Sequence, residues 1–222
     1  MCFLSFIGLV KFFSCKEYLD SLLAGYFHMT PPEKYRLDSR KGVGDCVESC
    51  MISYRSSRDD EYPLLILDGH VITGIDNLTM HNGSTKDSWL NCWFKLDAPI
   101  DPDEANELLL TLEAMKEEFG RDYAFVHKDN IPELIKRLND FSQYPVYASP
   151  VSYDDDKRKW GTLCKSSAYA YQREYRFYSG LCNPHELKDY AFQVDGGLKD
   201  IILDNPSLSM ENNGHTIFTL NR

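Results

Sequence analysis

Two long helical patterns stand among many short runs of β-favouring residues, and this mixture constrains the fold most. Over residues 102–119, apolar side chains recur at helical spacing, Asp101 is a candidate N-cap and acidic residues fill the first turn. A second helix is predicted over 131–141, after a short strand at 123–127. The sequence therefore predicts an α+β fold, in which a mixed or antiparallel sheet forms the core and a few helices lie outside it.

The start of the chain predicts a strand, a helix and a second strand. An apolar run favours a buried strand over 4–13, and residues 16–25 have helical spacing with a glycine at the end. Residues 26–30 favour an extended conformation, and the polar residues 33–44 predict a loop. The first apolar run is much shorter than the roughly 20 residues of a membrane helix and has no basic residue before it, so neither a membrane span nor a signal peptide is expected.

Further strands are predicted along the rest of the chain. They lie at 46–54, 62–67, 70–75, 90–96, 144–153, 169–178, 190–194, 201–203 and 216–220. Asp68-Gly69, between two of these runs, is a strong signal for a hairpin. No repeat or linker divides the chain, so one domain is expected over 1–222.

Charge and cysteine content limit the function classes. The chain has 24 basic and 34 acidic residues, a formal net charge of -10, which disfavours nonspecific binding to duplex nucleic acid. The seven cysteines form an odd set with no CxxC motif, which favours a reduced, cytoplasmic protein. Cys46 and Cys50 have the i, i+4 spacing of one helical face, but no second pair of ligands follows them, so no resident metal ion is predicted.

The segment from 165 to 178, KSSAYAYQREYRFY, carries the strongest functional signal. If residues 168–178 form one strand, period-two alternation places Gln172, Glu174 and Arg176 on one face. Aromatic residues on the opposite face favour burial, and a buried polar face needs partners or a ligand. The alternative is a solvated face on which a glutamate–arginine pair contributes little stability.

The tripeptide 172–174, Gln-Arg-Glu, on a late strand resembles the catalytic strand of mono-ADP-ribosyltransferases. The resemblance implies that NAD is the co-substrate, that Glu174 engages the nicotinamide ribose and that Gln172 helps to position the acceptor. A carboxylate held there would stabilise the positive charge that builds on the ribose as nicotinamide departs.

The first strand, helix and second strand resemble the layout of DarT-like transferases, in which such a unit and a following arginine build the NAD pocket. This likeness implies that His28, Tyr35 and Arg36 bind NAD, with Arg40 as a competitor for the role of Arg36. An arginine there would hold the pyrophosphate by charge-assisted hydrogen bonds, and a tyrosine would stack on a ring.

A closer resemblance covers a large part of the chain and is to a poorly characterised family of bacterial and phage-associated proteins. It is carried by residues 35–36, 42–49, 90–94, 165–176 and 196–201. Some proteins of this type resemble CmdT-like transferases of phage-defence toxin systems, which act on RNA. The resemblance implies a toxin that transfers ADP-ribose to RNA or protein and is restrained by a cognate antitoxin. Transfer to water, which is NAD glycohydrolysis, stays an open alternative.

A catalytically inactive binding module of a phage or defence operon is a second function class. In such a module, Gln172 and Glu174 would lie on a flat surface of a purely structural strand. In a transferase, the same pair should line a pocket together with His28 or Arg36.

A metal-dependent nuclease is a third function class. It would bring Asp45 or Glu48 together with other carboxylates, such as the run 59–61, on one ion. The sequence shows no lysine clustered with these acids, and a charged run is usually a solvated loop.

Overall fold

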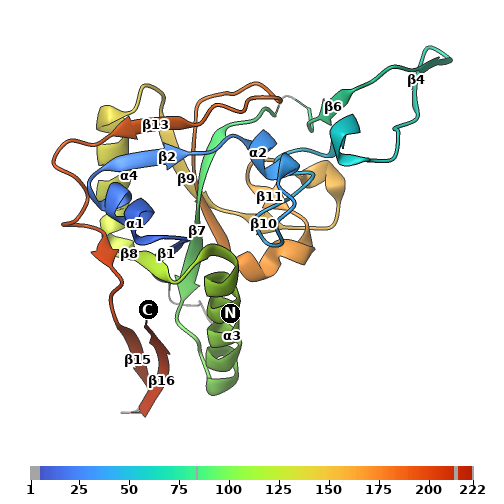
Figure 1. Ribbon diagram of the computed structural model, residues 1–222. Coiled ribbons are helices and arrows are strands. Elements are labelled where there is room, and N and C mark those ends of the chain that lie inside the picture. Colours follow the sequence, from blue (N-terminus) through green and yellow to red (C-terminus); the bar gives the residue numbers. More distant parts are fainter. Residues whose placement is uncertain (1–5, 84, 213–214, 222) are drawn as a thin grey trace.

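The computed structural model describes residues 6–83, 85–212 and 215–221 (Figure 1). A six-stranded antiparallel sheet lies at its centre, with the strand order β14, β8, β1, β7, β12, β9. These strands are β1 (Phe6–Phe13), β7 (Trp89–Asp97), β8 (Asp122–His127), β9 (Val146–Pro150), β12 (Glu174–Ser179) and β14 (Leu203–Asp204). The mostly antiparallel sheet with few helices agrees with the predicted α+β class.

Helices cover both faces of this sheet. The α-helices are α1 (Lys16–Leu23), α2 (Pro32–Leu37), α3 (Pro102–Phe119) and α4 (Ile131–Phe141), and the 3-10 helices are η1 (Ser56–Arg58), η2 (Lys128–Asn130), η3 (Lys157–Lys159) and η4 (Ser167–Gln172). The predictions for α3 and α4 are confirmed, and the Asp101 side chain accepts a hydrogen bond from Glu104 N as an N-cap should. Every helix within the described residues is too short or too polar to span a bilayer.

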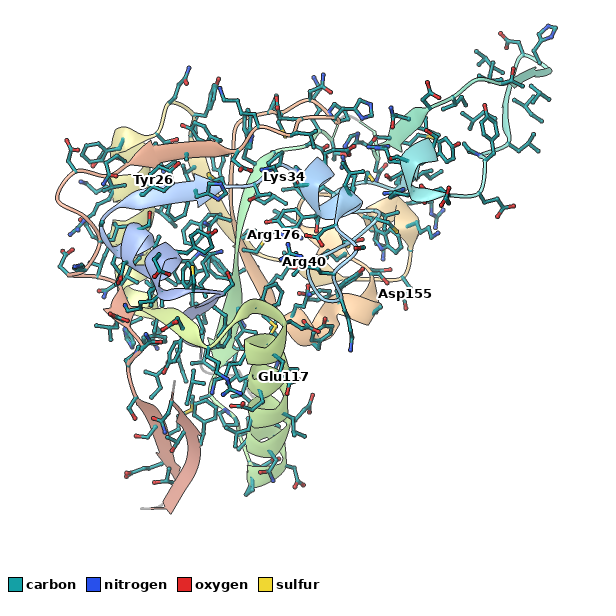
Figure 2. The ribbon with its side chains drawn as sticks, in the orientation of Figure 1. Tyr26, Lys34, Arg40, Glu117, Asp155 and Arg176 are labelled. Carbon is teal, nitrogen blue, oxygen red and sulfur yellow. The ribbon has the colours of Figure 1, made fainter. Side chains whose placement is uncertain are left out.

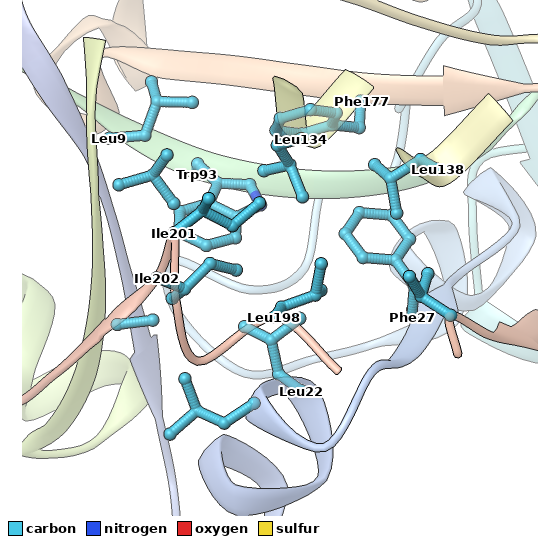
Figure 3. Close-up of a cluster of buried hydrophobic side chains, with 14 of the residues drawn as sticks. Leu9, Leu22, Phe27, Trp93, Leu134, Leu138, Phe177, Leu198, Ile201 and Ile202 are labelled. Atoms are coloured by element: carbon cyan, nitrogen blue, oxygen red, sulfur yellow. The ribbon is translucent and has the colours of Figure 1, made fainter. Parts of the chain in front are cut away.

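The two faces of the sheet form separate hydrophobic cores because side chains alternate along each strand. One core joins β1, β7 and β12 to α1 and α4, through buried residues that include Leu9, Trp93, Phe177, Leu22 and Leu134 (Figure 3). The other core joins the opposite face to α3, through buried residues that include Val10, Phe12, Phe94, Leu108 and Leu112. Burial of these side chains on both sides fixes the position of the central strands.

Five two-stranded sheets surround the central one. They pair β2 (Tyr26–Met29) with β13 (Tyr190–Gln193), β3 (Ile52–Arg55) with β6 (Asn77–Met80), β4 (Leu65–Leu67) with β5 (His70–Ile72), β10 (Ser152–Tyr153) with β11 (Cys164–Lys165), and β15 (Leu208–Asn212) with β16 (His215–Leu220). The predicted hairpin is confirmed: it joins β4 to β5 through Asp68 (φ 50°) and Gly69 (φ 78°), as a type I′ turn requires. This hairpin projects from the rest of the molecule (Figure 1).

Along one edge of β7, the central sheet opens between β1 and Thr30, the residue that follows β2. Strand β1 pairs with β7 only as far as Val10, although it pairs with β8 as far as Phe13. Further along β7, Leu90 pairs instead with Thr30, which follows β2. We call the opening between 11–13 of β1 and Thr30 the fork. Because regular strand pairing stops there, the fork leaves room beside β7 for side chains and for a cavity.

The predicted strand over 168–178 is wrong in its first half. Residues Ser167–Gln172 form η4, and β12 begins only at Glu174. Between them, Arg173 has the left-handed conformation (φ 41°), which ends the 3-10 helix and starts the strand. Simple alternation therefore does not relate Gln172 to Glu174.

Other predictions are corrected in their bounds. The expected loop at 33–44 begins with most of α2, because proline at the start of this segment favours a first helical turn. The expected strand at 46–54 is mostly turns and becomes a strand only at β3, and 201–203 contributes only the first residue of β14. The predicted residues 4–5 lie outside the described residues.

Candidate functional site

A buried lysine is the centre of the site. Lys165 Nζ lies 2.7 Å from Glu174 Oε1, 3.4 Å from Glu48 Oε2 and 3.7 Å from Asp45 Oδ2. It also donates a 3.2 Å hydrogen bond to Gln172 Oε1. The predicted catalytic pair therefore lies together, joined through one ammonium group.

Arg176 completes this group of charges, which we call the Lys165 cluster: Asp45, Glu48, Lys165, Gln172, Glu174 and Arg176. Its Nε donates to Glu174 Oε2 (2.7 Å), its Nη2 to Glu48 Oε2 (2.9 Å) and its Nη1 to the backbone oxygen of Thr162 (2.7 Å). Arg176 is fully buried and lies toward the middle of the molecule, whereas Asp155 lies on its outer side (Figure 2). Three carboxylates thus face two cations out of water, an arrangement that depends on every partner.

Local structure explains how distant residues meet in the Lys165 cluster. The left-handed turn at Arg173 directs Gln172 and Glu174 toward the same ammonium, and short β11 supplies Lys165. Asp45 and Glu48 come from the turns before β3, where Glu48 N donates to Asp45 O. The sequence segments 42–49 and 165–176 are therefore neighbours in space.

The cluster sets the protonation of its carboxylates. Burial alone would raise the pKa of Glu174, but Arg176 and Lys165 outweigh it and hold this pKa below its usual range. Burial and the neighbouring Glu48 raise the pKa of Asp45 to about 6. Burial opposes the charge of Lys165, yet Glu174 and Glu48 raise its pKa above the ordinary value. Glu174 is consequently ionised at neutral pH.

Two neighbouring cavities lie at the fork. The first, of about 200 Å³, is lined by the polar side chains of Glu48, Lys165, Gln172 and Glu174 and by apolar residues that include Phe94 and Phe119. The second, of about 530 Å³, is lined by His28, Asn91 and Asp189 and by aromatic residues that include Phe13, Tyr18 and Tyr26. Lys11 and Tyr35 line both cavities, so they form the boundary between them. The second cavity has the volume of a typical ligand pocket, and the first is smaller and supplies most of the convergent polar groups.

The predicted NAD-binding residues divide between these cavities and the interior. His28 projects from β2 into the second cavity, where its Nε2 lies 3.0 Å from Asp189 Oδ2. Lys34 Nζ contacts the same carboxylate oxygen at 2.6 Å. Tyr35, on α2, faces both cavities, and burial raises its pKa well above the usual range, so its hydroxyl stays protonated.

Arg36 does not face either cavity. Its Nη1 and Nη2 bind Asp87 in a bidentate pair at 2.8 Å each, and its Nε and Nη2 donate to the backbone oxygen of Glu48 at 2.9 and 2.7 Å. Its side chain is 0% exposed. With its guanidinium fully engaged by protein, Arg36 is a structural residue here rather than a group available to a ligand.

Arg36 belongs to a second buried ion group, the Arg36 cluster, which consists of Glu33, Arg36, Arg55 and Asp87. Glu33 accepts from Arg55 Nε at 2.7 Å, and its Oε2 lies 3.5 Å from Arg36 Nη1. The competitor Arg40 is elsewhere: its side chain is 72% exposed and pairs with Asp38. Neither of the two arginines named from the resemblance lines either cavity at the fork.

The carboxylates named for a metal nuclease do not gather as that class requires. Asp45 and Glu48 converge with Glu174 on Lys165, whereas the run 59–61 lies near the base of the β4–β5 hairpin. Over 6–83, 85–212 and 215–221, no group of three histidine, cysteine or acidic residues has an arrangement that would hold a metal ion. The six described cysteines, from Cys15 to Cys182, are free thiols.

Sequence reasoning missed two lysines of the site. Lys165 is the first residue of the segment 165–178, but the sequence predicted no functional role for it. Lys11 interrupts the otherwise apolar strand FIGLVKFF, which is a signal in itself because a charged residue in a central strand needs a reason. The contribution of Glu48 was considered only for a metal site.

Comparisons with known proteins give no family assignment: no protein-family model, curated protein or solved structure matches this chain.

Proposed function

We propose that the protein is an NAD-consuming ADP-ribosyltransferase in which Glu174 is the catalytic carboxylate and Gln172 helps to position the acceptor. One observation carries the proposal: both residues line a cavity that borders a second cavity containing His28. A transferase was expected to place Gln172 and Glu174 in one pocket with His28 or Arg36, and a binding module was expected to leave the pair on a flat surface. The pair lines a cavity, with His28 in the neighbouring cavity and Arg36 in neither. The sequence resemblance to ADP-ribosyltransferases is what singled out these residues, and their place at the cavities is consistent with it.

The reaction would exchange one bond at the nicotinamide ribose. The bond between the ribose carbon and the nicotinamide nitrogen breaks, and its electron pair leaves with nicotinamide, which becomes neutral. A hydroxyl or amine of the acceptor forms the new bond to that carbon and releases one proton. The products are ADP-ribosyl acceptor, nicotinamide and a proton.

The lowered pKa of Glu174 favours an electrostatic role. An ionised carboxylate close to the ribose stabilises the positive charge that develops as nicotinamide departs. A carboxylate with so low a pKa is a weak proton acceptor, so the proton of the acceptor would pass to another group or to water. Lys165 and Arg176 then act as positioning residues, because they hold Glu174 ionised and in one orientation.

The acceptor and the biological setting come from the resemblance. We propose RNA or protein as the acceptor, a role in phage defence and a cognate antitoxin as partner. The free cysteines favour a reduced, cytoplasmic setting.

A catalytically inactive binding module is the second candidate, and one observation favours it. Both oxygens of Glu174 already accept hydrogen bonds from Lys165 and Arg176, so the Lys165 cluster also holds together without a ligand. In that case the cavities would bind a ligand that is not consumed.

Nicotinamide release from labelled NAD by the purified protein, with total cellular RNA and protein offered as acceptors, separates these candidates. We expect the wild type to release nicotinamide and E174Q to lose roughly 10²- to 10³-fold in rate, as when one electrostatic contact to a transition state is removed. E33Q is the matched control, because Glu33 is also a buried carboxylate paired with arginine but lines neither cavity. Folded E33Q should keep the wild-type rate.

Three results would decide against the transferase. Wild-type protein that binds NAD without releasing nicotinamide would favour the binding module. Equal rates for E174Q and the wild type would remove Glu174 from the reaction, and equal losses in E174Q and E33Q would show a general effect of disturbing buried charge.

A further inference from the structure

Lys11 is a half-buried cation whose charge the protein does not balance by direct contact. It lies in the middle of β1, and its Nζ donates one hydrogen bond, to the backbone oxygen of Cys92 at 2.8 Å. The same atom lies 6.0 Å from the ring centroids of Phe13 and Trp93. Among the described residues, no carboxylate lies within 4.0 Å of Lys11 Nζ. Burial lowers the pKa of Lys11, which means that its charged form is costly in the absence of an anion.

The other basic side chains that line the two cavities already have carboxylate partners. Lys165 contacts Glu174 at 2.7 Å, and the imidazole of His28 contacts Asp189 at 3.0 Å. Lys11 differs from both because its ammonium uses only one of three donors, in a hydrogen bond to a neutral backbone oxygen. An anionic ligand that entered the fork would therefore find its available partner at Lys11.

The position of Lys11 defines the kind of anion. The residue lines both cavities, so a group bound to it would lie between the aromatic walls of the second cavity and Glu174 in the first. The carboxylates of Glu48 and Glu174 on one side and of Asp189 on the other disfavour negative charge at either end. A ligand that matches this pattern has an aromatic ring at one end, an electron-poor group at the other and its negative charge in the middle.

We propose that Lys11 binds the diphosphate bridge of a dinucleotide that spans both cavities. This inference deepens the proposed function and rests on it for the identity of the ligand as NAD. It gives to Lys11 the pyrophosphate contact that the sequence resemblance assigned to Arg36. An ammonium acts here as a point charge rather than as a bidentate fork, so the contact tolerates small changes in phosphate orientation.

Calorimetric titration of the full chain with NAD, ADP-ribose, inorganic pyrophosphate and adenosine tests the proposal. In K11M, which keeps an unbranched side chain one atom shorter and removes the charge, we expect affinity for NAD and ADP-ribose to fall roughly 10- to 100-fold, as when a charged hydrogen bond is lost. Affinity for adenosine should stay unchanged, and K11R should recover part of the loss. K95M is the matched control, because Lys95 also projects from the central sheet but pairs with Asp97 and lines neither cavity.

A measurement on the wild type keeps the test independent of folding in K11M. With ¹⁵N-labelled lysine, ADP-ribose should shift the Nζ resonance of Lys11 and leave that of Lys95 in place. An unmoved Lys11 resonance at saturation would overturn the proposal. So would NAD affinity that is unchanged in folded K11M, an equal loss for adenosine, or a wild type that binds none of the phosphate-containing probes.

The outcomes separate this inference from the proposed function. If ADP-ribose or pyrophosphate binds through Lys11 but NAD is not consumed, the anion site stands and the transferase fails. If NAD is consumed with the same KM in K11M and the wild type, the transferase stands and the role of Lys11 fails.

Discussion

The Lys165 cluster and the Arg36 cluster have nearly the same chemistry and different surroundings. Each holds buried carboxylates against buried cations, and in each an arginine is fully enclosed. The Lys165 cluster, however, forms a wall of a cavity at the fork, whereas no member of the Arg36 cluster lines either fork cavity. The two clusters therefore differ in their place at the fork rather than in burial or ion pairing, and Asp87 of the Arg36 cluster lines a separate cavity beside Cys182.

The comparison predicts that the Arg36 cluster matters for stability and not for ligand binding. R36M should lower the free energy of unfolding by about 3–5 kcal/mol, because Asp87 would remain buried without its bidentate partner and with His81 alone beside it. Urea unfolding followed by fluorescence measures this loss. R40A is the control, and it should change stability by less than about 0.5 kcal/mol because Arg40 is exposed. Near-normal stability of R36M together with weaker NAD binding would reverse the assignment of the two clusters.

The Lys165 cluster should show the opposite behaviour at Asp45, because burial and the neighbouring Glu48 make the charge of this carboxylate costly. Asp45 has a pKa raised to about 6 from an ordinary value of 3.8, mainly by burial and by Glu48. A raised pKa in the folded state favours the protonated acid, so its stabilising contribution is complete below pH 4 and is lost as the pH rises through 6. D45N should therefore be more stable than the wild type above pH 7, by roughly 2–3 kcal/mol, and equal to it near pH 4.

Urea unfolding at several pH values between 4 and 8 measures this difference. D156N is the control with the opposite sign, since hydrogen bonds from Arg158 lower the pKa of Asp156 to about 2 and the group is exposed. Its replacement should cause only a small loss of stability, present above pH 4. A D45N variant that is less stable than the wild type at pH 8 would show that Lys165 needs the charge of Asp45.

Local signals in the sequence were sufficient for the helices α1, α3 and α4 and for one hairpin. The helix α3 has its N-cap at Asp101, its acidic first turn and its apolar stripe within one continuous segment, and all three act locally. The β4–β5 hairpin likewise depends on two adjacent residues that tolerate positive φ. Such features do not need the rest of the molecule to be known.

The arrangement of the candidate site depends on contacts between residues distant in the sequence, which local patterns do not predict. The strand expected over 168–178 was wrong because alternation does not detect the left-handed residue Arg173, although that residue brings Gln172 and Glu174 to the same lysine. Arg36 follows the second predicted strand, where the resemblance places an NAD-binding arginine. Its side chain is held in the interior by Asp87, which is 51 residues away in the sequence. The sequence predicted that Gln172 and Glu174 lie together. The fold was needed to show which lysines and acidic residues surround them.

The smallest predicted effect concerns Gln172, the uncharged member of the Lys165 cluster. Q172A removes a 2.6 Å hydrogen bond from its Nε2 to Gly42 O and a 3.2 Å contact of its Oε1 with Lys165. Two neutral or singly charged hydrogen bonds of this kind predict a loss of about 1–2 kcal/mol in the free energy of unfolding. The control is Q193A, since Gln193 is exposed but also donates a hydrogen bond, to Ala24 O at 2.7 Å, and its loss should stay below about 0.5 kcal/mol.

Activity of the same pair of variants sharpens the comparison between the clusters. If Gln172 positions an acceptor at the first cavity, Q172A should reduce transfer of label to the acceptor more than it reduces release of nicotinamide to water. If Gln172 has only a structural role, Q172A should lower the rates of transfer and of hydrolysis equally, in proportion to the folded fraction. A change in stability alone leaves the ratio of transfer to hydrolysis unchanged. This ratio therefore tests whether Gln172 contacts the acceptor or only helps to form the wall of the cavity.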